Sequence, residues 1–183
     1  RLLFGRIRYR FGEFKGEAEF RDPTTTISPP SDDAFVIKAV SDDNYGSETY
    51  LRIEDDPSYT VRIYIRFDLT NLPTGARLDT AKVKLYYYEY YWNDPAGKQT
   101  DIHRVLESWN EDTITWNNQP SYASTATSST NMPADYGWVE WDVTDDVKGM
   151  LDGTYDNYGW CIKFHTEGVS PFSRAKFYSK EYD

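Results

Sequence analysis

Four aromatic side chains recur at every second position near the middle of the sequence: Tyr86, Tyr88, Tyr90 and Trp92. Alternate side chains of a strand point to the same face, so this spacing predicts a row of rings along one strand over residues 81–92. Flat aromatic surfaces bury well against the apolar faces of sugar rings, which makes the row a candidate glycan-binding site. Two other interpretations stay open: cross-strand packing of the rings within the sheet, or burial under a neighbouring subunit.

The side chains that usually carry catalysis form no recognisable pattern. Both histidines, His103 and His165, fall in segments with strand character, which favours structural or surface roles. The sequence contains no Gly-x-Ser-x-Gly elbow, no phosphate-binding loop and no His or Cys spacing typical of a metal enzyme. Two carboxylates for glycoside hydrolysis could be picked from 30 acidic residues, but with so many the choice carries no information. We therefore expect a non-catalytic protein with no catalytic residues.

One oxygen-rich turn is a candidate metal site. Asp42, Asp43 and Asn44 precede a Tyr-Gly pair, and Asp156 and Asn157 stand in an equivalent Asp-Asn-Tyr-Gly turn. Ca²⁺ prefers oxygen ligands, so a structural Ca²⁺ at 42–44 is one hypothesis, although the EF-hand pattern is absent. The alternative is that these residues only favour turn geometry.

Composition limits the partners and the compartment. The 183 residues fit one domain, and their net charge of −10 argues against nucleic acid or an anionic membrane as a partner. No apolar run is long enough to span a membrane. The single cysteine, Cys161, permits no internal disulfide and leaves the compartment undecided. Because the chain begins at Arg1 and not at Met, we expect a secreted or cell-surface protein whose leader was removed.

The first residues predict a strand-forming arm. Apolar and arginine side chains alternate there, as in a strand with one buried face. Residues 1–21 hold six basic and three acidic residues, whereas 22–183 hold 14 basic and 27 acidic residues. A basic arm suits docking on an acidic body, either that of another copy or its own. The arm residues expected to make this contact are Phe4, Arg6, Ile7, Arg8, Tyr9, Arg10 and Phe11.

Three segments follow from the patterning. We expect an arm at 1–12, a flexible Pro/Thr/Ser-rich linker at 13–32 and one domain at 33–183. Short strands with period-two alternation, separated by Gly, Asn and Pro turns, predict an all-β fold: an antiparallel β-sandwich of the jelly-roll type. One short helix is expected over 145–151, capped by Thr144 and ended by Gly153. Trp109 and Trp116 are expected to pin a loop to the core.

A set of short motifs follows one another along residues 33–181. The motifs are Asp33-Ala34-Phe35-Val36, Asn44-Tyr45-Gly46, Arg66-Phe67-Asp68-Leu69, Leu72-Pro73, Gly75-Ala76, Leu85-Tyr86, Trp109-Asn110-Glu111, Thr115-Trp116-Asn117-Asn118, Pro120, Trp141-Asp142-Val143-Thr144, Asn157-Tyr158-Gly159 and Phe177-Tyr178-Ser179-Lys180-Glu181. In this order they resemble the DNRLRE-type domain. That group includes carbohydrate-binding modules attached to polysaccharide lyases and repeats related to the disaggregatase of methanogenic archaea. The resemblance implies a non-catalytic jelly-roll module, secreted or on the cell surface.

The resemblance also implies a further strand after Glu181, and the sequence ends at Asp183. A sheet short of one strand exposes apolar side chains and backbone groups that another strand could cover. We therefore expect a homopolymer, a pilus-like surface filament in which the arm of one copy completes the sheet of the next. Two alternatives stay open: the arm folds into its own domain, or the sequence was cut before its last strand. A non-catalytic carbohydrate-binding module is the second expected function.

Overall fold

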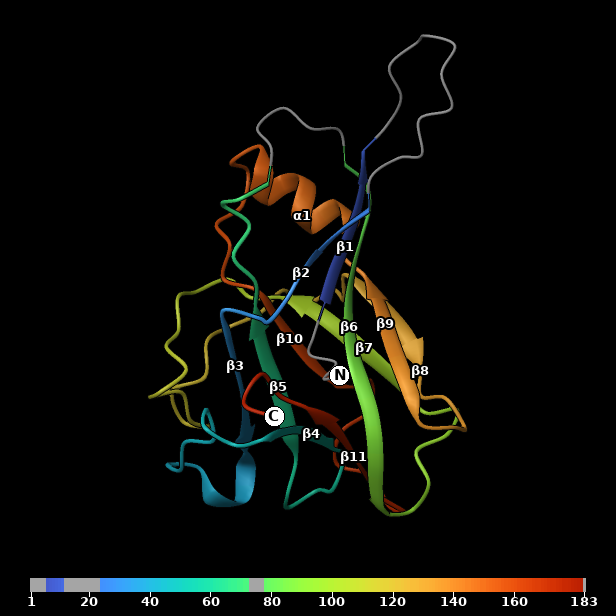
Figure 1. Ribbon diagram of the computed structural model, residues 1–183. Coiled ribbons are helices and arrows are strands. Elements are labelled where there is room, and N and C mark those ends of the chain that lie inside the picture. Colours follow the sequence, from blue (N-terminus) through green and yellow to red (C-terminus); the bar gives the residue numbers. More distant parts are fainter. Residues whose placement is uncertain (1–5, 12–23, 73–77, 183) are drawn as a thin grey trace, which may run out of the picture.

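The computed structural model describes residues 6–11, 24–72 and 78–182, and these residues form one antiparallel sheet with a short helix at one end (Figure 1). This confirms the all-β class. The strands are β1 (Arg6–Phe11), β2 (Thr24–Ile27), β3 (Asp32–Ile37), β4 (Tyr50–Glu54), β5 (Val61–Arg66), β6 (Leu78–Trp92), β7 (Gln99–Arg104), β8 (Ser128–Asn131), β9 (Gly137–Asp142), β10 (Trp160–Phe164) and β11 (Ser173–Tyr178). The helices are the 3₁₀ turn η1 (Lys38–Val40) and α1 (Thr144–Leu151).

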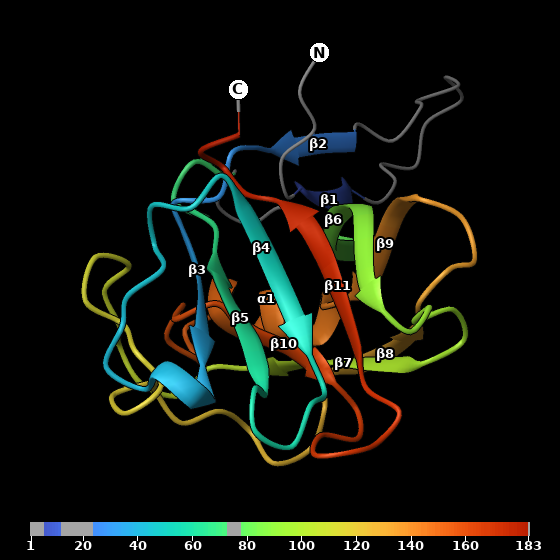
Figure 2. The same cartoon turned by 90° about the horizontal axis from the view of Figure 1, so that it is seen from below.

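The expected sandwich is a single curved sheet that nearly closes on itself. Its path runs β2-β1-β6-β11-β4-β5-β10-β7-β8, with β3 beside β5 and β9 beside β6. The sheet turns a corner between β4 and β5, which share only the pair Glu54 and Val61. Strand β8 contacts β9, so the two ends of the described sheet come together. In Figure 2, β4 and β11 cross in front of β10 and β7, and the core lies between these layers.

The core follows from the alternation of the strands. The odd-numbered residues of β5, and those of β6 from Ala81 to Tyr87, point inward, and Ile63, Val83 and Leu85 are fully buried. A second, smaller cluster lies on the outer side of β5, where Tyr64 and Cys161 pack under Trp109. Trp109 therefore pins the segment between β7 and β8 to the sheet, as expected, and its Nε1 donates to the carbonyl of Tyr158 at 2.8 Å. Burial raises the pKa of Cys161 to about 12, which leaves it a neutral, inert side chain.

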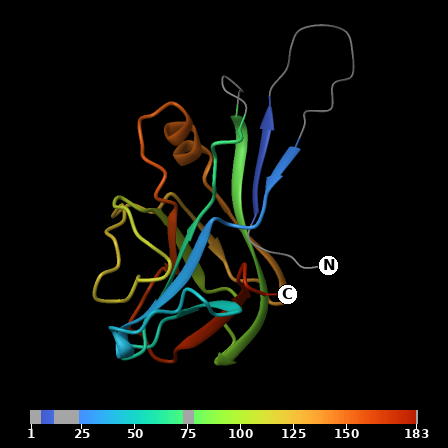
Figure 3. The same ribbon diagram turned by 60° about the vertical axis from the view of Figure 1, so that its left-hand side comes forward.

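The N-terminal strand β1 lies in the sheet of its own chain, between β2 and β6 (Figure 3). It pairs antiparallel with β6 from Arg6 opposite Lys84 to Phe11 opposite Leu78. Strand β11 pairs with the other half of β6, from Ser173 opposite Trp92 to Phe177 opposite Tyr87. Strand β1 therefore continues the line of β11 along β6 in the same direction. Phe4 lies outside the described residues.

The expected linker at 13–32 needs a correction. Residues 24–27 form strand β2, which pairs with β1 from Thr24 opposite Arg10 to Ile27 opposite Ile7, and β3 already begins at Asp32. Four residues of mostly threonine carry no apolar alternation, so only the pairing partner reveals the strand. Residues 13–23 lie outside the described residues.

The helix is where the sequence predicts it, but its start differs. Helix α1 begins with Thr144, and Val143 holds the N-cap position without a side-chain cap. The Thr144 hydroxyl instead accepts a hydrogen bond from the backbone N–H of Ala81 at 3.0 Å. Gly153 follows the helix with φ of 79°, as expected for the residue that ends it. None of the helices in the described part is long and apolar enough to cross a membrane.

Candidate functional site

The predicted row of four rings is divided by a β-bulge. Tyr87 lies opposite Phe177 and Glu89 lies opposite Lys176, so Tyr88 is an extra residue on β6. One extra residue exchanges the two faces of a strand for everything that follows it. Tyr86 and Tyr88 therefore stay on the outer face of the sheet, whereas Tyr90, opposite the buried Ala175, turns toward the inner side.

The first half of the row is a packed group, here called the aromatic stack. The rings of Tyr88 and Tyr178 are parallel, with centroids 4.3 Å apart. The ring of Tyr86 also stacks on the ring of Tyr178, with centroids 5.7 Å apart, and it meets the Trp138 ring edge-on at 5.4 Å. Tyr182 covers Tyr178 at 4.0 Å. For these positions the structure favours cross-strand packing over an open binding surface.

The second half of the row, Tyr90 and Trp92, is exposed. Together with the exposed rings of Tyr91 and Tyr136 it is here called the aromatic tip. Trp92 is 66% exposed, more than any other large apolar side chain among the described residues, and Tyr136 is 54% exposed. The rings of Tyr90 and Tyr136 lie 6.4 Å apart. Phe172 supports Trp92 edge-on at 5.7 Å. The aromatic tip ends β6, at the opposite end of the molecule from α1 (Figure 1).

The backbone of Trp92 is strained. Its φ is 72°, and it is the only residue other than glycine with a positive φ among the described residues. A bulky side chain in this region costs about 1–2 kcal/mol, and such positions cluster at functional sites. The indole at this position is mostly exposed, at the end of the strand. Packing within the protein does not explain why an exposed indole is kept at a position with an unfavourable backbone conformation.

A cleft of about 160 Å³ lies beside the segment that supports Trp92. Phe164 and Val169 form its apolar wall, and Lys98, Gln99 and His165 supply polar groups. The Lys98 ammonium bonds Asp55 at 2.6 Å and the carbonyl of Pro171, the neighbour of Phe172, at 3.2 Å. His165 Nδ1 lies 2.7 Å from Oδ2 of Asp101, and the carboxylate accepts the hydrogen bond. Sugar hydroxyl groups could therefore find hydrogen-bonding partners next to an aromatic platform.

Four cationic side chains of the outer face bond carboxylates. Lys176 bonds Glu89 at 3.1 Å, and its ammonium lies 4.7 Å from the centre of the Tyr91 ring. Arg174 bonds Glu54 at 2.8 Å. Further along β6, Lys82 and Lys84 both bond Glu140. Arg52, opposite Lys176 on the same face, has a buried Nε without a hydrogen-bond partner.

The side chains of the turn expected to bind Ca²⁺ are hydrogen-bonded to the segment 111–117. Asp42 accepts from the side chain of Asn117 at 2.8 Å. The amide of Asn44 donates to the carbonyl oxygens of Glu111 and Ile114, at 2.7 and 2.8 Å. These contacts support the turn-geometry alternative.

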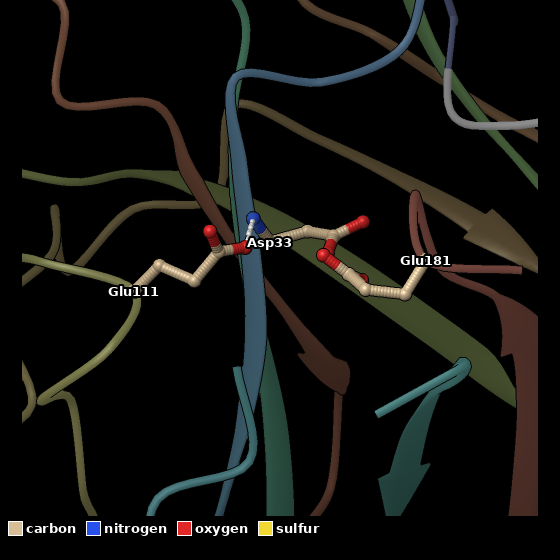
Figure 4. A group of neighbouring side chains, drawn as sticks. All are labelled: Asp33, Glu111 and Glu181. Carbon is tan, nitrogen blue, oxygen red and sulfur yellow. Dashed lines mark hydrogen bonds between the residues drawn. The ribbon is translucent and has the colours of Figure 1, made fainter. Parts of the chain in front are cut away.

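Three carboxylates meet elsewhere, at the surface of β3: Asp33, Glu111 and Glu181 (Figure 4). One oxygen from each lies within 4.8 Å of the others. Asp33 is 2% exposed, and its carboxylate accepts from the backbone N–H of Lys180 at 2.9 Å. Glu111 accepts from the N–H of Asp33 at 2.8 Å. The ammonium of Lys180 bonds Glu111 and lies 3.3 Å from Glu181.

The motif around Asn44 builds this carboxylate group. Besides the amide of Asn44, Gly46 approaches Glu111 so closely that a Cβ there would lie 2.3 Å from its carbonyl oxygen. Only glycine permits that approach. Three of the segments that carry the sequence resemblance, beginning at Asp33, Trp109 and Phe177, each supply one carboxylate.

The comparison with family models supports the second of the two expected functions. Residues 24–183 match the model of carbohydrate-binding module family 96. The chain belongs to this family. A protein named gellan lyase, from a Bacillus species, is 34% identical over 104 residues, which are 55% of this chain and 4% of that protein. The family confirms the second expected function, a carbohydrate-binding module, and such a module is a non-catalytic domain.

Sequence reasoning missed two features of the module. The first is the aromatic tip, which includes Tyr91 and Tyr136 in addition to residues of the period-two row. The sequence pattern does not show the bulge at Tyr88 that separates this tip from the aromatic stack. The carboxylate group joins residues 33, 111 and 181, whose separation hides it. The two histidines were expected to be structural or at the surface. His103 is buried, with Nδ1 at 2.8 Å from the carbonyl of Ala123, and His165 is exposed at the rim of the cleft.

Proposed function

We propose that the chain is a polysaccharide-binding module of a secreted polysaccharide-degrading protein, and that the aromatic tip holds the sugar. The single observation that supports this site is Trp92, exposed on a strained backbone at the end of β6. An indole face is a good platform for an apolar sugar face, and the exposed rings of Tyr90 and Tyr91 come directly before it in the chain. The sequence resemblance to modules attached to polysaccharide lyases supports the same class of parent protein.

Polysaccharide binding by native affinity electrophoresis tests the proposal. We expect gellan in the gel to slow the module, with a panel of neutral and acidic polysaccharides to define selectivity. Trp92→Ala should abolish the retardation. Tyr155→Ala is the control: it removes another exposed ring, from the segment after α1, and should retain binding. Retardation that is absent with every polysaccharide would refute the function, and equal retardation of Trp92→Ala would refute the site.

A second candidate function is assembly by exchange of β1 between copies. Its support is the position of β1, which extends the line of β11 on β6 and joins the rest of the sheet only through β2 and β6. The same antiparallel pairs could form with the β6 of a neighbour, as in domain swapping or donor-strand addition. In the structure of one chain β1 lies in its own sheet, which is the self-complementation alternative.

Light scattering on size-exclusion fractions tests the exchange. The intact chain should form concentration-dependent oligomers or filaments, and a chain lacking residues 1–11 should not. Added synthetic peptide of residues 1–11 should bind the shortened chain. A folded monomer at all concentrations for both chains would exclude the assembly and leave the glycan-binding proposal untouched.

A further inference from the structure

The group of Asp33, Glu111 and Glu181 holds more negative charge than its protein partners neutralise. Three carboxylates face the single ammonium of Lys180. Burying a carboxylate is costly unless it is paired or hydrogen-bonded, or coordinates a metal. Burial is also the main reason why the pKa of Asp33 is raised well above its ordinary value, with Glu181 adding to the effect.

Two carboxylate oxygens in this group have no hydrogen-bond partner. Oδ1 of Asp33 and Oε2 of Glu181 are both buried and accept nothing. The other oxygens are used: Asp33 Oδ2 takes the N–H of Lys180, and Glu111 Oε1 takes the N–H of Asp33. Figure 4 shows the Asp33 and Glu181 carboxylates turned toward each other. Two buried acceptors that face each other without a donor between them need a cation or a proton.

We propose that Asp33, Glu181 and Glu111 bind a hard divalent cation, Ca²⁺, as a structural metal. Carboxylate oxygens are the ligands that Ca²⁺ prefers, at about 2.3–2.6 Å from the ion, so two ligands of one ion lie up to about 5 Å apart. The observed separation within 4.8 Å fits this limit. Lys180 bonds Glu111 and Glu181 through the oxygens Oε2 and Oε1, which leaves Oε2 of Glu181 for the metal.

The ion would join three parts of the module that are distant in the sequence. Asp33 belongs to β3, Glu111 to the segment pinned by Trp109, and Glu181 to the segment after β11. That last segment also carries Tyr182, which covers the aromatic stack. Ca²⁺ should therefore stabilise the fold without touching the aromatic tip, and the proposal does not depend on glycan binding.

Calorimetry and thermal unfolding of the EDTA-treated and dialysed full chain test the site, with Ca²⁺ alone and then Mg²⁺ alone as probes. We expect one Ca²⁺ to bind, and Tm to rise by about 5 °C at a hundredfold excess over Kd. Glu181→Gln should remove both effects, and Asp33→Asn should do the same. The matched control is Asp43→Asn in the turn that the sequence first suggests, which should respond as fully as the natural chain.

The pH dependence separates a metal from a shared proton. Carboxylates bind a metal ion only when they are deprotonated, and Asp33 is one of the three proposed ligands. Glu111, whose pKa burial also raises, and Glu181 and Lys180 face the same group. The Ca²⁺-induced rise in Tm should therefore grow with pH, because the ion competes with the proton.

The proposal is overturned if neither Ca²⁺ nor Mg²⁺ binds or shifts Tm at pH 7 or 8, which would leave a protonated carboxyl pair as the explanation. It is also overturned if the Ca²⁺ response survives in both Asp33→Asn and Glu181→Gln, or disappears in Asp43→Asn. Loss of the response in either carboxylate variant, with its fold intact by circular dichroism, supports it. If one variant fails to fold, the other decides.

Discussion

The aromatic stack and the aromatic tip are both built around strand β6 and contain the same kinds of residue. The rings of the aromatic stack pack against one another, whereas those of the aromatic tip are exposed to solvent. Tyr88 packs parallel to Tyr178 at 4.3 Å, whereas Trp92 meets Phe172 edge-on and leaves two thirds of its surface to solvent. The bulge at Tyr88 separates them. The difference shows that an aromatic row is a binding face only where neighbouring strands do not already stack on it.

The largest effect should come from the aromatic stack. Tyr178→Ala removes the ring shared by Tyr86, Tyr88 and Tyr182. We expect the free energy of unfolding to fall by about 3 kcal/mol, because a large ring is lost from packed surroundings. Urea unfolding measures this change. Polysaccharide affinity at low temperature should stay as in the natural chain; a loss of affinity there would mean that the stack itself binds sugar.

Trp92→Ala should show the reverse. We expect affinity for the bound polysaccharide to fall about 30-fold, or about 2 kcal/mol, because a central aromatic contact is lost. The unfolding free energy should change by less than about 1 kcal/mol, since the side chain is mostly exposed. Isothermal titration with an oligosaccharide and urea unfolding give the two numbers. A large loss of stability with unchanged affinity would reverse the roles of the two regions.

A third comparison isolates the backbone of the aromatic tip. Trp92→Gly and Trp92→Ala both lack the ring, but only glycine accepts a φ of 72° without strain. We expect the glycine variant to be more stable than the alanine variant by about 1 kcal/mol. At an ordinary strand position the order is reversed. Equal stabilities, or a more stable alanine variant, would show that the strand end relaxes and that position 92 carries no strain.

The smallest effect concerns titration within the aromatic stack. Burial, and after it the charge of Glu89, raises the pKa of the Tyr88 phenol. Because the folded pKa exceeds the unfolded value of about 10, this group contributes stability that is present below about pH 10 and lost at higher pH. The pKa of several other tyrosines, Tyr64 and Tyr87 among them, is also raised, so absorbance at 295 nm should show one late-titrating tyrosine fewer in Tyr88→Phe than in the natural chain. At pH 7 that variant should unfold within about 0.5 kcal/mol of the natural chain.

The sequence predicts those parts of the module that depend on local alternation. Periodicity predicts the inward residues of β5 and of the first part of β6. Local sequence signals also predict the short helix and Gly153, which follows its end. Strands β2 and β8 are not predicted from the sequence, because short polar segments form strands only through pairing with their neighbours.

The candidate sites are harder to predict. The exposure of Trp92 depends on a one-residue bulge that the pairing with β11 reveals, and no periodic pattern contains it. The carboxylate group depends on three chain segments that meet only in the folded sheet, so its members look like three ordinary acids among 30. Recognised motifs placed these residues correctly in a family, but their common location is a property of the fold.

The ion pairs around the rings have a consequence for ionic strength. Because Lys176 and Arg174 are matched by Glu89 and Glu54, capture of an uncharged polysaccharide should barely respond to added salt. An acidic polysaccharide meets the net charge of −10 of the whole chain, so salt should strengthen its binding by screening the repulsion. The module would then hold acidic polymers best in brackish or marine conditions, where many charged binding proteins lose their ligands.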